Sequence, residues 1–475
     1  MISNDTIIAL ATPSGAGAIA VIRISGKEAI SICDAHFKSV RGKCLVNQAT
    51  HTIHLGHIIK HDKVLDEVLV SVFKNPNSYT GENVVEISCH GSPYIQQEII
   101  QLFLRVGCRI ANPGEFTLRA FLNGKLDLSQ AEAVADLISS DNEASHQIAM
   151  QQMRGGFSTE IKALRDELLN FASLIELELD FAEEDVEFAN RDEFKDLIQR
   201  IVKVLKHLID SFAIGNVIKN GIPVAIVGEP NVGKSTLLNA LFNEEKAIVS
   251  AIAGTTRDAI EDELNISGIG FRFIDTAGIR ETQDVVESIG IKKTFEKITQ
   301  SQVVIYLFDA NSVGNNSSAV DDIVVEIEKI KHKFPDKPLI IVTNKIDKID
   351  EDKLSVISKS VEKSLETFRT NTVFLKLSAK NKDGIDDLKK SLLQFVNTGA
   401  LRNNDTIITN SRHYDALLKA LEEIQKVQLG MNANLSGDLL AIDIRQALYH
   451  FGEITGEITS DDLLGNIFAN FCIGK

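Results

Sequence analysis

The sequence predicts a multidomain protein: an α+β domain at the N-terminus, a discontinuous all-α domain, and an α/β domain inserted into the all-α one. Its 475 residues are too many for one ordinary domain and correspond to about three. No proline falls between Pro113 and Pro223 or after Pro338, and long proline-free stretches suit helices. Strand-like and helix-like segments alternate over residues 217–397, as expected of an α/β domain.

Residues 1–118 are rich in β-branched residues, several of them in period-2 alternation, which indicates strands with one buried face. We predict a helix over residues 93–106, preceded by strands over residues 6–12, 18–25, 50–59, 65–73 and 83–88. These elements together predict a small α+β domain.

The two stretches that flank the α/β segment, residues 119–215 and 398–475, both have apolar residues at helical spacing. The residues with this spacing are Ala131, Val134, Ala135, Ile138, Leu197, Ile201, Val204, Leu208, Leu417, Leu418, Leu421 and Ile424. The simplest arrangement packs both stretches together as one helical domain, so that residues 216–397 form an insertion into it.

The chain has 50 basic and 66 acidic residues, which gives a formal net charge of −16. Phosphate binding needs positive charge, so this balance argues against a protein that holds nucleic acid through a large basic field. It also argues against an anionic membrane surface as the partner, and no apolar stretch long enough to span a membrane occurs. We expect no signal peptide. The five cysteines form no CxxC pair, which favours a reducing compartment and hence the cytoplasm.

A glycine-rich loop lies between a short apolar strand, residues 224–227, and an expected helix, residues 236–242. The loop is Gly228-Glu-Pro-Asn-Val-Gly233-Lys234-Ser235, which has the pattern G-x-x-x-x-G-K-S. In this context the pattern is typical of a phosphate site, because backbone N–H groups and the helix N-terminus face the phosphate oxygens. We expect Lys234 to reach the β- and γ-phosphates and Ser235 to supply a hydroxyl to Mg²⁺.

Four further segments follow this loop in a characteristic order. They are a switch-like loop at residues 254–258, Asp275-Thr276-Ala277-Gly278, Asn344-Lys345-Ile346-Asp347 and Ser378-Ala379-Lys380, the last three each after a predicted strand. In this order the five segments resemble a Ras-like P-loop GTPase domain over about residues 217–397. Asp347 identifies the base as guanine, since an ionised carboxylate accepts from guanine N1–H and N2–H₂, whereas adenine offers an acceptor there.

The position directly after the Asp275–Gly278 motif, where many Ras-like proteins have a water-orienting Gln, is Ile279. Another group must therefore stabilise the transition state. The candidates are two arginines, Arg257 and Arg280, or a monovalent cation held by Asn231 and carbonyls of residues 250–255. Thr256 is the expected second Mg²⁺ ligand, although the spacing does not distinguish it from Thr255.

Other segments extend the resemblance to the whole chain. They are NDTI (4–7), RISG (23–26), PNSYTGE (76–82), PGEF (113–116), RAFLNGKLDL (119–128), EITSDDLLG (457–465) and the terminal FCIGK (471–475). With these segments the chain resembles the bacterial tRNA modification GTPases of the MnmE (TrmE) family, of the TrmE-Era-EngA-like class.

The resemblance implies an N-terminal folate-binding and dimer-forming domain (1–118), a helical domain (119–215 plus 398–475) and an inserted GTPase domain (216–397). It implies K⁺-dependent GTP hydrolysis through dimerising GTPase domains. The implied K⁺ ligands are Asn231, Ser250, Ile252 and Thr255, and Glu287 would position the attacking water. The expected nucleotide contacts are Asn231, Val232, Gly233, Lys234, Ser235, Thr236, Ser250, Ala251, Ile252, Ala253, Gly254, Thr255, Thr256, Asp275, Thr276, Ala277, Gly278, Asn344, Lys345, Asp347, Ser378, Ala379 and Lys380.

For the folate, 5-formyl- or methylene-tetrahydrofolate, the matching residues are Arg23, Glu86, Lys125 and Lys475. The implied reaction adds an aminomethyl or carboxymethylaminomethyl group to C5 of the wobble uridine (position 34) of certain tRNAs. A partner that uses FAD and NADH, MnmG, would share the reaction in a heterotetramer and would provide most tRNA contacts, given the charge of this chain. Cys472 is a candidate for the modification step, with a free buried thiol as the alternative. The rival function is a GTP-switched ribosome-assembly factor without modification chemistry.

Overall fold

The protein is described by a computed structural model over residues 5–180, 190–245, 262–274, 295–314, 319–364, 366, 371–395, 406–433, 435–469, 471 and 474. Contacts divide the chain into two compact units. The first combines Met1–Ser139, Ala149–His207 and Ser411–Lys475, and the second combines Ser140–Ile148 with Leu208–Asn410. None of the helices in the described ranges is long and apolar enough to cross a membrane.

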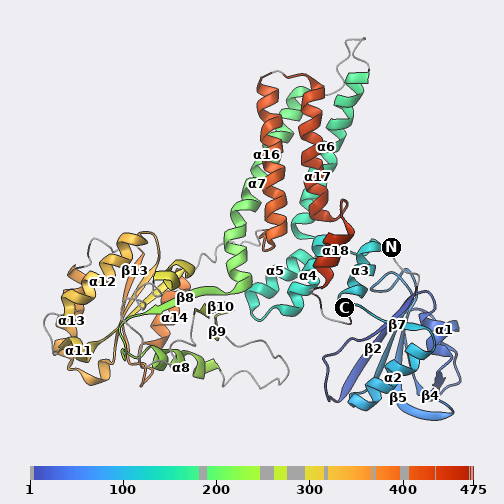
Figure 1. The fold of residues 1–475 in the computed structure, drawn as a ribbon, viewed down its shortest axis with the longest axis horizontal. Helices are drawn as coiled ribbons and strands as arrows, with labels where there is room; N and C mark the ends of the chain where they lie inside the picture. Colours follow the sequence, from blue (N-terminus) through green and yellow to red (C-terminus); the bar gives the residue numbers. More distant parts are fainter. Residues whose placement is uncertain are drawn as a thin grey trace. The chain divides into compact units, whose positions relative to one another are not determined.

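The first unit begins with a sheet that, among the described residues, has seven strands in the order β3-β4-β5-β6-β2-β1-β7 (Figure 1). Neighbouring strands are antiparallel, except that β1 and β7 are parallel. The strands are β1 (Thr6–Leu10), β2 (Ile19–Ser25), β3 (Phe37–Ser39), β4 (Thr52–Lys60), β5 (Lys63–Phe73), β6 (Val84–His90) and β7 (Cys108–Ile110). The five predicted strands are confirmed, whereas β3 and β7 are too short for alternation to reveal them.

The two faces of this sheet differ because side chains alternate along each strand. Ile22, Ile87 and Phe103 belong to one buried cluster, in which α1 (Ala29–Asp34) and α2 (Pro93–Arg105) cover one face. On the opposite face the strand register aligns one row of side chains across β4, β5, β6 and β2, namely Ile53, Ser71, Glu86 and Arg23. The open face of the sheet therefore carries Arg23 and Glu86, two of the four expected folate residues.

The rest of the first unit is helical. Its helices are α3 (Glu115–Leu122), α4 (Leu128–Ser139), the end of α5 (Glu143–Met153), α6 (Gly156–Asp180), α7 (Arg191–Asn220) up to His207, α16 (Ser411–Asn432), α17 (Gly437–Thr455) and α18 (Asp461–Ala469). Helix α17 packs against both α6 and α16, and Leu128 of α4 shares a cluster with Leu464 and Phe468 of α18. Helices from the two separate stretches thus pack together, which confirms a discontinuous helical domain.

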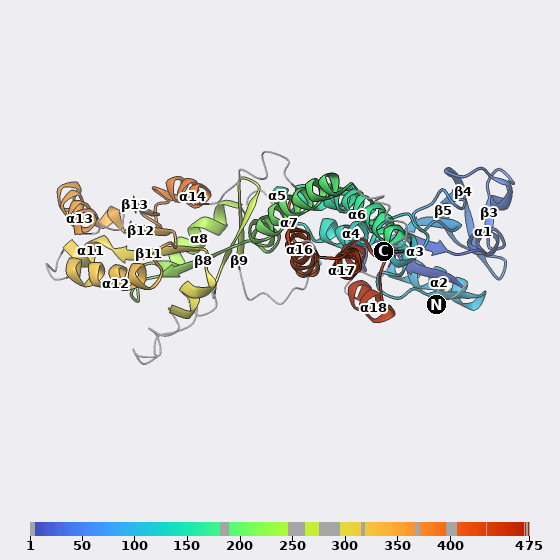
Figure 2. The ribbon, with the colours of Figure 1, turned by 90° about the horizontal axis from the view of Figure 1, so that it is seen from above.

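The second unit contains, in its described residues, a six-stranded sheet in the order β13-β12-β11-β8-β10-β9 (Figure 2). All neighbours are parallel except β9 and β10. The strands are β8 (Ile222–Val227), β9 (Asp262–Ile266), β10 (Ile269–Phe273), β11 (Val303–Asp309), β12 (Leu339–Asn344) and β13 (Thr372–Lys376). Helices α8 (Lys234–Glu245) and α14 (Ile385–Gln394) contribute to one buried cluster, and α12 (Ala319–Lys333) and α13 (Glu351–Ser364) to another. Helices on both faces of a mostly parallel sheet confirm the predicted α/β class.

Candidate functional site

The loop between β8 and α8 has the compact backbone that the phosphate-site motif predicts. Gly228 has a φ of +139°, and a Cβ on it would lie 2.0 Å from the carbonyl oxygen of Leu307. Gly233 has a φ of +103°, and its Cβ would lie 2.4 Å from Nδ2 of Asn344. Only glycine fits these two positions, because both the backbone conformation and the space exclude a side chain.

Lys234 begins α8 and lies within this loop. Its Nζ donates to the carbonyl oxygens of Gly228 at 2.6 Å and of Glu229 at 2.9 Å. Burial lowers the pKa of Lys234. The loop carbonyls thus hold this amine beside the α8 N-terminus, where a phosphate is favoured.

Asn344 connects two of the predicted motifs. Its Nδ2 donates to the carbonyl oxygen of Val232 at 2.8 Å, and its Oδ1 accepts from the N–H of Ala379 at 3.1 Å. The side chain is only 1% exposed, so both bonds are shielded from water. Through this one amide, the loop after β8 and the segment after β13 are held together at the end of β12.

Asp347 is a solvent-exposed residue at the edge of a pocket that Asn344 also lines. Its Oδ1 accepts from Oγ of the buried Ser378 at 2.6 Å, and this hydrogen bond holds the pKa of Asp347 below its usual range. The carboxylate is therefore ionised at neutral pH and can accept hydrogen bonds from a base. The pocket has a volume of about 260 Å³ and is lined by Gly233, Thr236, Asn344, Lys345, Asp347, Lys348, Ala379 and Lys380.

Lys345 has a left-handed backbone, with a φ of 63°. Its Nζ donates to the carbonyl oxygen of Asn231 at 2.7 Å and to Oδ2 of Asp309 at 2.7 Å. The sequence motifs did not indicate Asp309. The signal that could have found it is the uninterrupted apolar run of β11, which is typical of a central parallel strand and ends in this acid.

The structure also brings together expected residues on the open face of the N-terminal sheet. Arg23 Nε and Nη2 lie 2.9 and 2.7 Å from Oε1 of Glu86 on the neighbouring strand, and the two side chains are 16% and 26% exposed. The Arg23 guanidinium lies 5.4 Å from the ring centre of Tyr79 and 5.6 Å from that of Phe116. Its Nη1 donates to the carbonyl oxygen of Gly474 at 3.2 Å. Tyr79, Phe116 and Gly474 are contacts that the sequence reasoning missed.

Lys125 reaches the same area from the segment after α3. A Cβ on Gly81 would lie 3.4 Å from Cε of Lys125, so the lysine chain lies against the loop that carries Tyr79. Arg119, which is 3% exposed, anchors this loop by donating to Glu82 at 3.1 Å, and it also donates to Asp5, which precedes β1, at 2.7 Å. The expected folate residues Arg23, Glu86 and Lys125 thus contact one another or one shared loop.

Several predicted residues lie outside the described part of the chain, so their arrangement stays a prediction. They are Ser250, Ala251, Ile252, Ala253, Gly254, Thr255, Thr256, Arg257, Asp275, Thr276, Ala277, Gly278, Arg280, Glu287, Cys472 and Lys475.

The sequence matches two families, one described as the MnmE helical domain over residues 128–472 and one as the GTP-binding protein TrmE N-terminus over residues 6–125. The tRNA modification GTPase MnmE of Flavobacterium johnsoniae is 72% identical over 475 residues, which is 100% of both chains. That of Christiangramia forsetii is 70% identical and covers 99% of each chain. The chain belongs to the MnmE family of GTPases.

Among solved structures, the FeoB G-domain from Methanococcus jannaschii is 24% identical, with 37% of this chain and 97% of that chain covered and a TM-score of 0.25. The MnmE assignment rests on the full-length relatives and on the two family matches.

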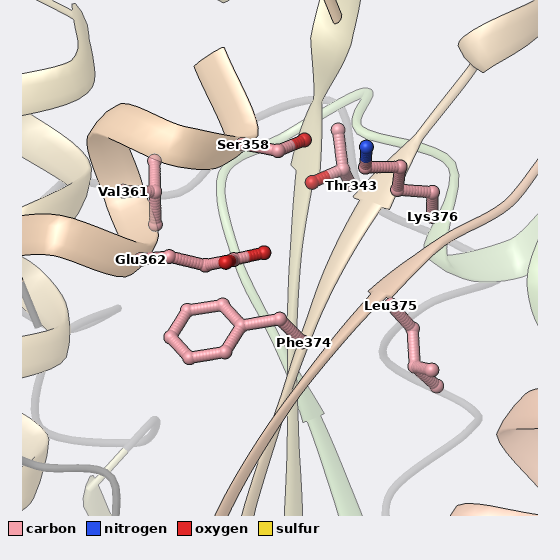
Figure 3. A pocket seen from close by; sticks show the side chains of 7 residues that line it. All are labelled: Thr343, Ser358, Val361, Glu362, Phe374, Leu375 and Lys376. Atoms are coloured by element: carbon pink, nitrogen blue, oxygen red, sulfur yellow. The ribbon is translucent and has the colours of Figure 1, made fainter. Parts of the chain in front are cut away.

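A second cavity in the GTPase unit of this MnmE family member is distinct from the nucleotide pocket. It lies between α13 and strands β12 and β13, and Figure 3 shows Thr343, Ser358 and Glu362 turned toward it. Its volume is about 20 Å³, which is room for about one water molecule. It is therefore too small to hold a nucleotide.

Proposed function

We propose that this protein is a K⁺-dependent GTPase that, with the flavoprotein MnmG, adds an aminomethyl or carboxymethylaminomethyl group to C5 of the wobble uridine of certain tRNAs. The observation that carries the proposal is the Arg23–Glu86 ion pair on the open sheet face, where Tyr79 and Phe116 flank the guanidinium. The same chain also has a site suited to guanine. A GTP-controlled assembly factor has no use for the site on the sheet face. We place the reaction in the cytoplasm, where tRNA is found.

The guanine site supports GTP as the nucleotide. The ionised Asp347 accepts hydrogen bonds from the guanine N1–H and N2–H₂, and each charge-assisted bond is worth about 1.5–3 kcal/mol. Lys234 and the backbone N–H groups of the loop bind the phosphates, and Ser235 offers a hydroxyl to Mg²⁺ at the start of α8. Mg²⁺ supplies charge neutralisation of the phosphates when it is bound.

Asn231 fits the expected K⁺ site by its chemistry. Its left-handed backbone, with a φ of 63°, is held by the bond from Lys345 to its carbonyl, and the exposed side chain ends in a neutral amide oxygen. Oxygen donors of this kind suit a hard cation. Ser250, Ile252 and Thr255 would complete the site, and Glu287 would orient the attacking water.

The N-terminal site fits a reduced folate. A pterin ring is flat and rich in N–H donors, which suit the Glu86 carboxylate that Arg23 holds in place, while the folate carboxylates, at the other end of the molecule, suit Lys125 and Lys475. Tyr79 and the fully buried Phe116 flank the Arg23 guanidinium, and the partly exposed Tyr79 offers aromatic surface at the site. The folate supplies the one-carbon unit, and the residues of this chain bind and orient it. FAD and NADH belong to the partner, and Cys472 is the proposed participant from the C-terminal segment.

We further propose that a second copy of the chain covers the open sheet face. Ile53 and Leu69 of this face are 67% and 46% exposed, and Ile53 lies in the same transverse row as Glu86 and Arg23. Together with Leu55, Arg41 and Lys43 they line a hollow of about 520 Å³. A homodimer would remove this apolar surface from water next to the folate site.

The test is a nucleoside analysis of tRNA from a strain without this gene, by liquid chromatography and mass spectrometry. We expect unmodified wobble uridine in the deletion strain, and full recovery with the wild-type gene but not with an Arg23→Gln variant. Normal wobble uridines in the deletion strain would refute the proposal, and an accompanying ribosome-subunit defect would favour the assembly factor. The net charge of −16 further predicts that tight tRNA binding needs MnmG.

A further inference from the structure

Asp309 is the last residue of β11 and belongs to none of the nucleotide-site motifs. Strands β11 and β12 are parallel, and Asp309 is in register with Asn344. Because parallel strands end at the same edge of a sheet, Asp309 lies beside the segment that recognises the base. The first residue of the phosphate loop, Gly228, packs against β11, because it closely approaches the carbonyl oxygen of Leu307.

Both carboxylate oxygens of Asp309 accept hydrogen bonds. Oδ2 accepts from Nζ of Lys345 at 2.7 Å, and Oδ1 accepts from the N–H of Asn311 at 2.9 Å, within the first turn of α11 (Ala310–Gly314). The Lys345 and Asp309 side chains are only 26% and 16% exposed, so water screens this ion pair less than a surface pair. Asp309 can therefore act in two ways, as a cap of α11 through Oδ1 and as the partner of Lys345 through Oδ2.

Lys345 transmits this contact to the phosphate loop. The same Nζ that meets Asp309 donates to the carbonyl oxygen of Asn231 at 2.7 Å. Asn231 and Lys345 both have a φ of 63°, a left-handed conformation that is unfavourable for most residues with a side chain and must be held by its surroundings. A continuous chain of polar contacts thus runs from Asp309 through Lys345 to the loop.

We propose that Asp309 is a positioning residue of the nucleotide site, which holds the Lys345 ammonium against the Asn231 carbonyl and thereby keeps the phosphate loop in its binding conformation. This inference rests on the nucleotide site proposed above. Without the Asp309 carboxylate, hydration of the Lys345 ammonium is more favourable than its one hydrogen bond to the Asn231 carbonyl. The loop then opens more often, and a bound guanine nucleotide dissociates faster.

The test is the dissociation rate of a fluorescent GDP analogue, mant-GDP, from the full chain in Na⁺ buffer with Mg²⁺. The informative variant is Asp309→Asn, because asparagine caps a helix as well as aspartate does but removes the charge that attracts Lys345. We expect mant-GDP to dissociate about tenfold faster from this variant, as the loss of one charge-assisted bond implies. The matched control is Asp321→Asn in the exposed first turn of α12, which should keep the wild-type rate.

A double-mutant cycle with Lys345→Gln separates positioning from a structural effect. Asp309→Asn should add nothing to the faster dissociation of Lys345→Gln, since the two residues act as one unit. A wild-type dissociation rate for Asp309→Asn, with only Asp309→Ala faster and less heat-stable, would show that Asp309 is merely a cap. Full additivity in the cycle would equally overturn the inference. Failure of the wild-type chain to bind mant-GDP would instead overturn the nucleotide site itself, and the inference with it.

Discussion

Arg412 and Glu132 form a two-bond ion pair that joins the two stretches of the helical domain. Arg412 Nε donates to Oε1 of Glu132 at 2.9 Å and Nη2 donates to Oε2 at 2.9 Å, across 280 positions of sequence. Nε2 of His413 lies 2.6 Å from the same Oε2. Burial opposes ionisation, but His413 and Arg412 outweigh it and lower the pKa of Glu132 to about 2. The pair fastens the start of α16 to α4.

Replacing Glu132 with Gln should destabilise the first unit by about 3 kcal/mol at neutral pH, because it leaves Arg412 without its charged partner. Since the folded-state pKa is depressed, this stabilisation is present above about pH 4.5, the ordinary Glu value, and is lost as the pH falls toward 2. Thermal unfolding of both proteins at pH 7 and pH 3 measures the difference, which should shrink in acid. Glu176→Gln, which breaks the exposed pair with Arg445, is the control and should cost less than about 1 kcal/mol.

The hydrogen bond from Ser378 to Asp347 should set the acid limit of guanine binding. Asp347 must be ionised to accept from the base, and its pKa is depressed chiefly by this bond, so binding holds above that pKa and is lost as the pH falls through it. In Ser378→Ala the pKa rises, and the loss of mant-GDP binding should begin at a higher pH. A titration of affinity against pH measures this onset. Ser391→Ala, another buried serine of the same unit, should leave the onset unchanged.

Arg23→Gln should weaken the binding of 5-formyltetrahydrofolate by about tenfold or more, because it removes the charged partner that orients Glu86 for the pterin. Calorimetric titration of the full chain measures the affinity, while GTP hydrolysis is followed in parallel and should not change. The matched control is Glu98→Gln, which breaks another ion pair of the same domain, with Lys60. Equal folate affinity in wild type and Arg23→Gln would remove Arg23 from the site.

GTP hydrolysis should be much faster in K⁺ than in Na⁺ at equal ionic strength, since the proposed cation site that includes Asn231 would bind the larger cation. Asn231→Ala should abolish the difference between the two salts and leave only the slow basal rate. Phosphate release in matched KCl and NaCl buffers measures both rates. Equal wild-type rates in the two salts would contradict the cation role of Asn231.

Much of this organisation could be predicted from local sequence. The loop Gly228–Ser235, the strand before it and the motif that contains Asp347 are each defined by a few consecutive residues, because a turn and a helix start depend on neighbours in the chain. The period-2 alternation of residues within the strands of the N-terminal domain was visible because it too depends on neighbouring residues. In that domain β3 and β7, which are too short for a period, were not predicted, and in the second unit β9 and β11 were not predicted either.

The tertiary structure decided the contacts between distant residues. The pairing of Arg23 with Glu86 depends on the register of β2 and β6, and the bond from Arg23 to Gly474 spans 451 positions. Asp309 meets Lys345 only because β11 and β12 end at one edge of the sheet. The sequence by itself thus determined which chemical groups this protein has and in which local motifs, since these follow from neighbouring residues. Strand register and helix packing decided which of those groups meet, because these depend on burying apolar surface across the whole chain.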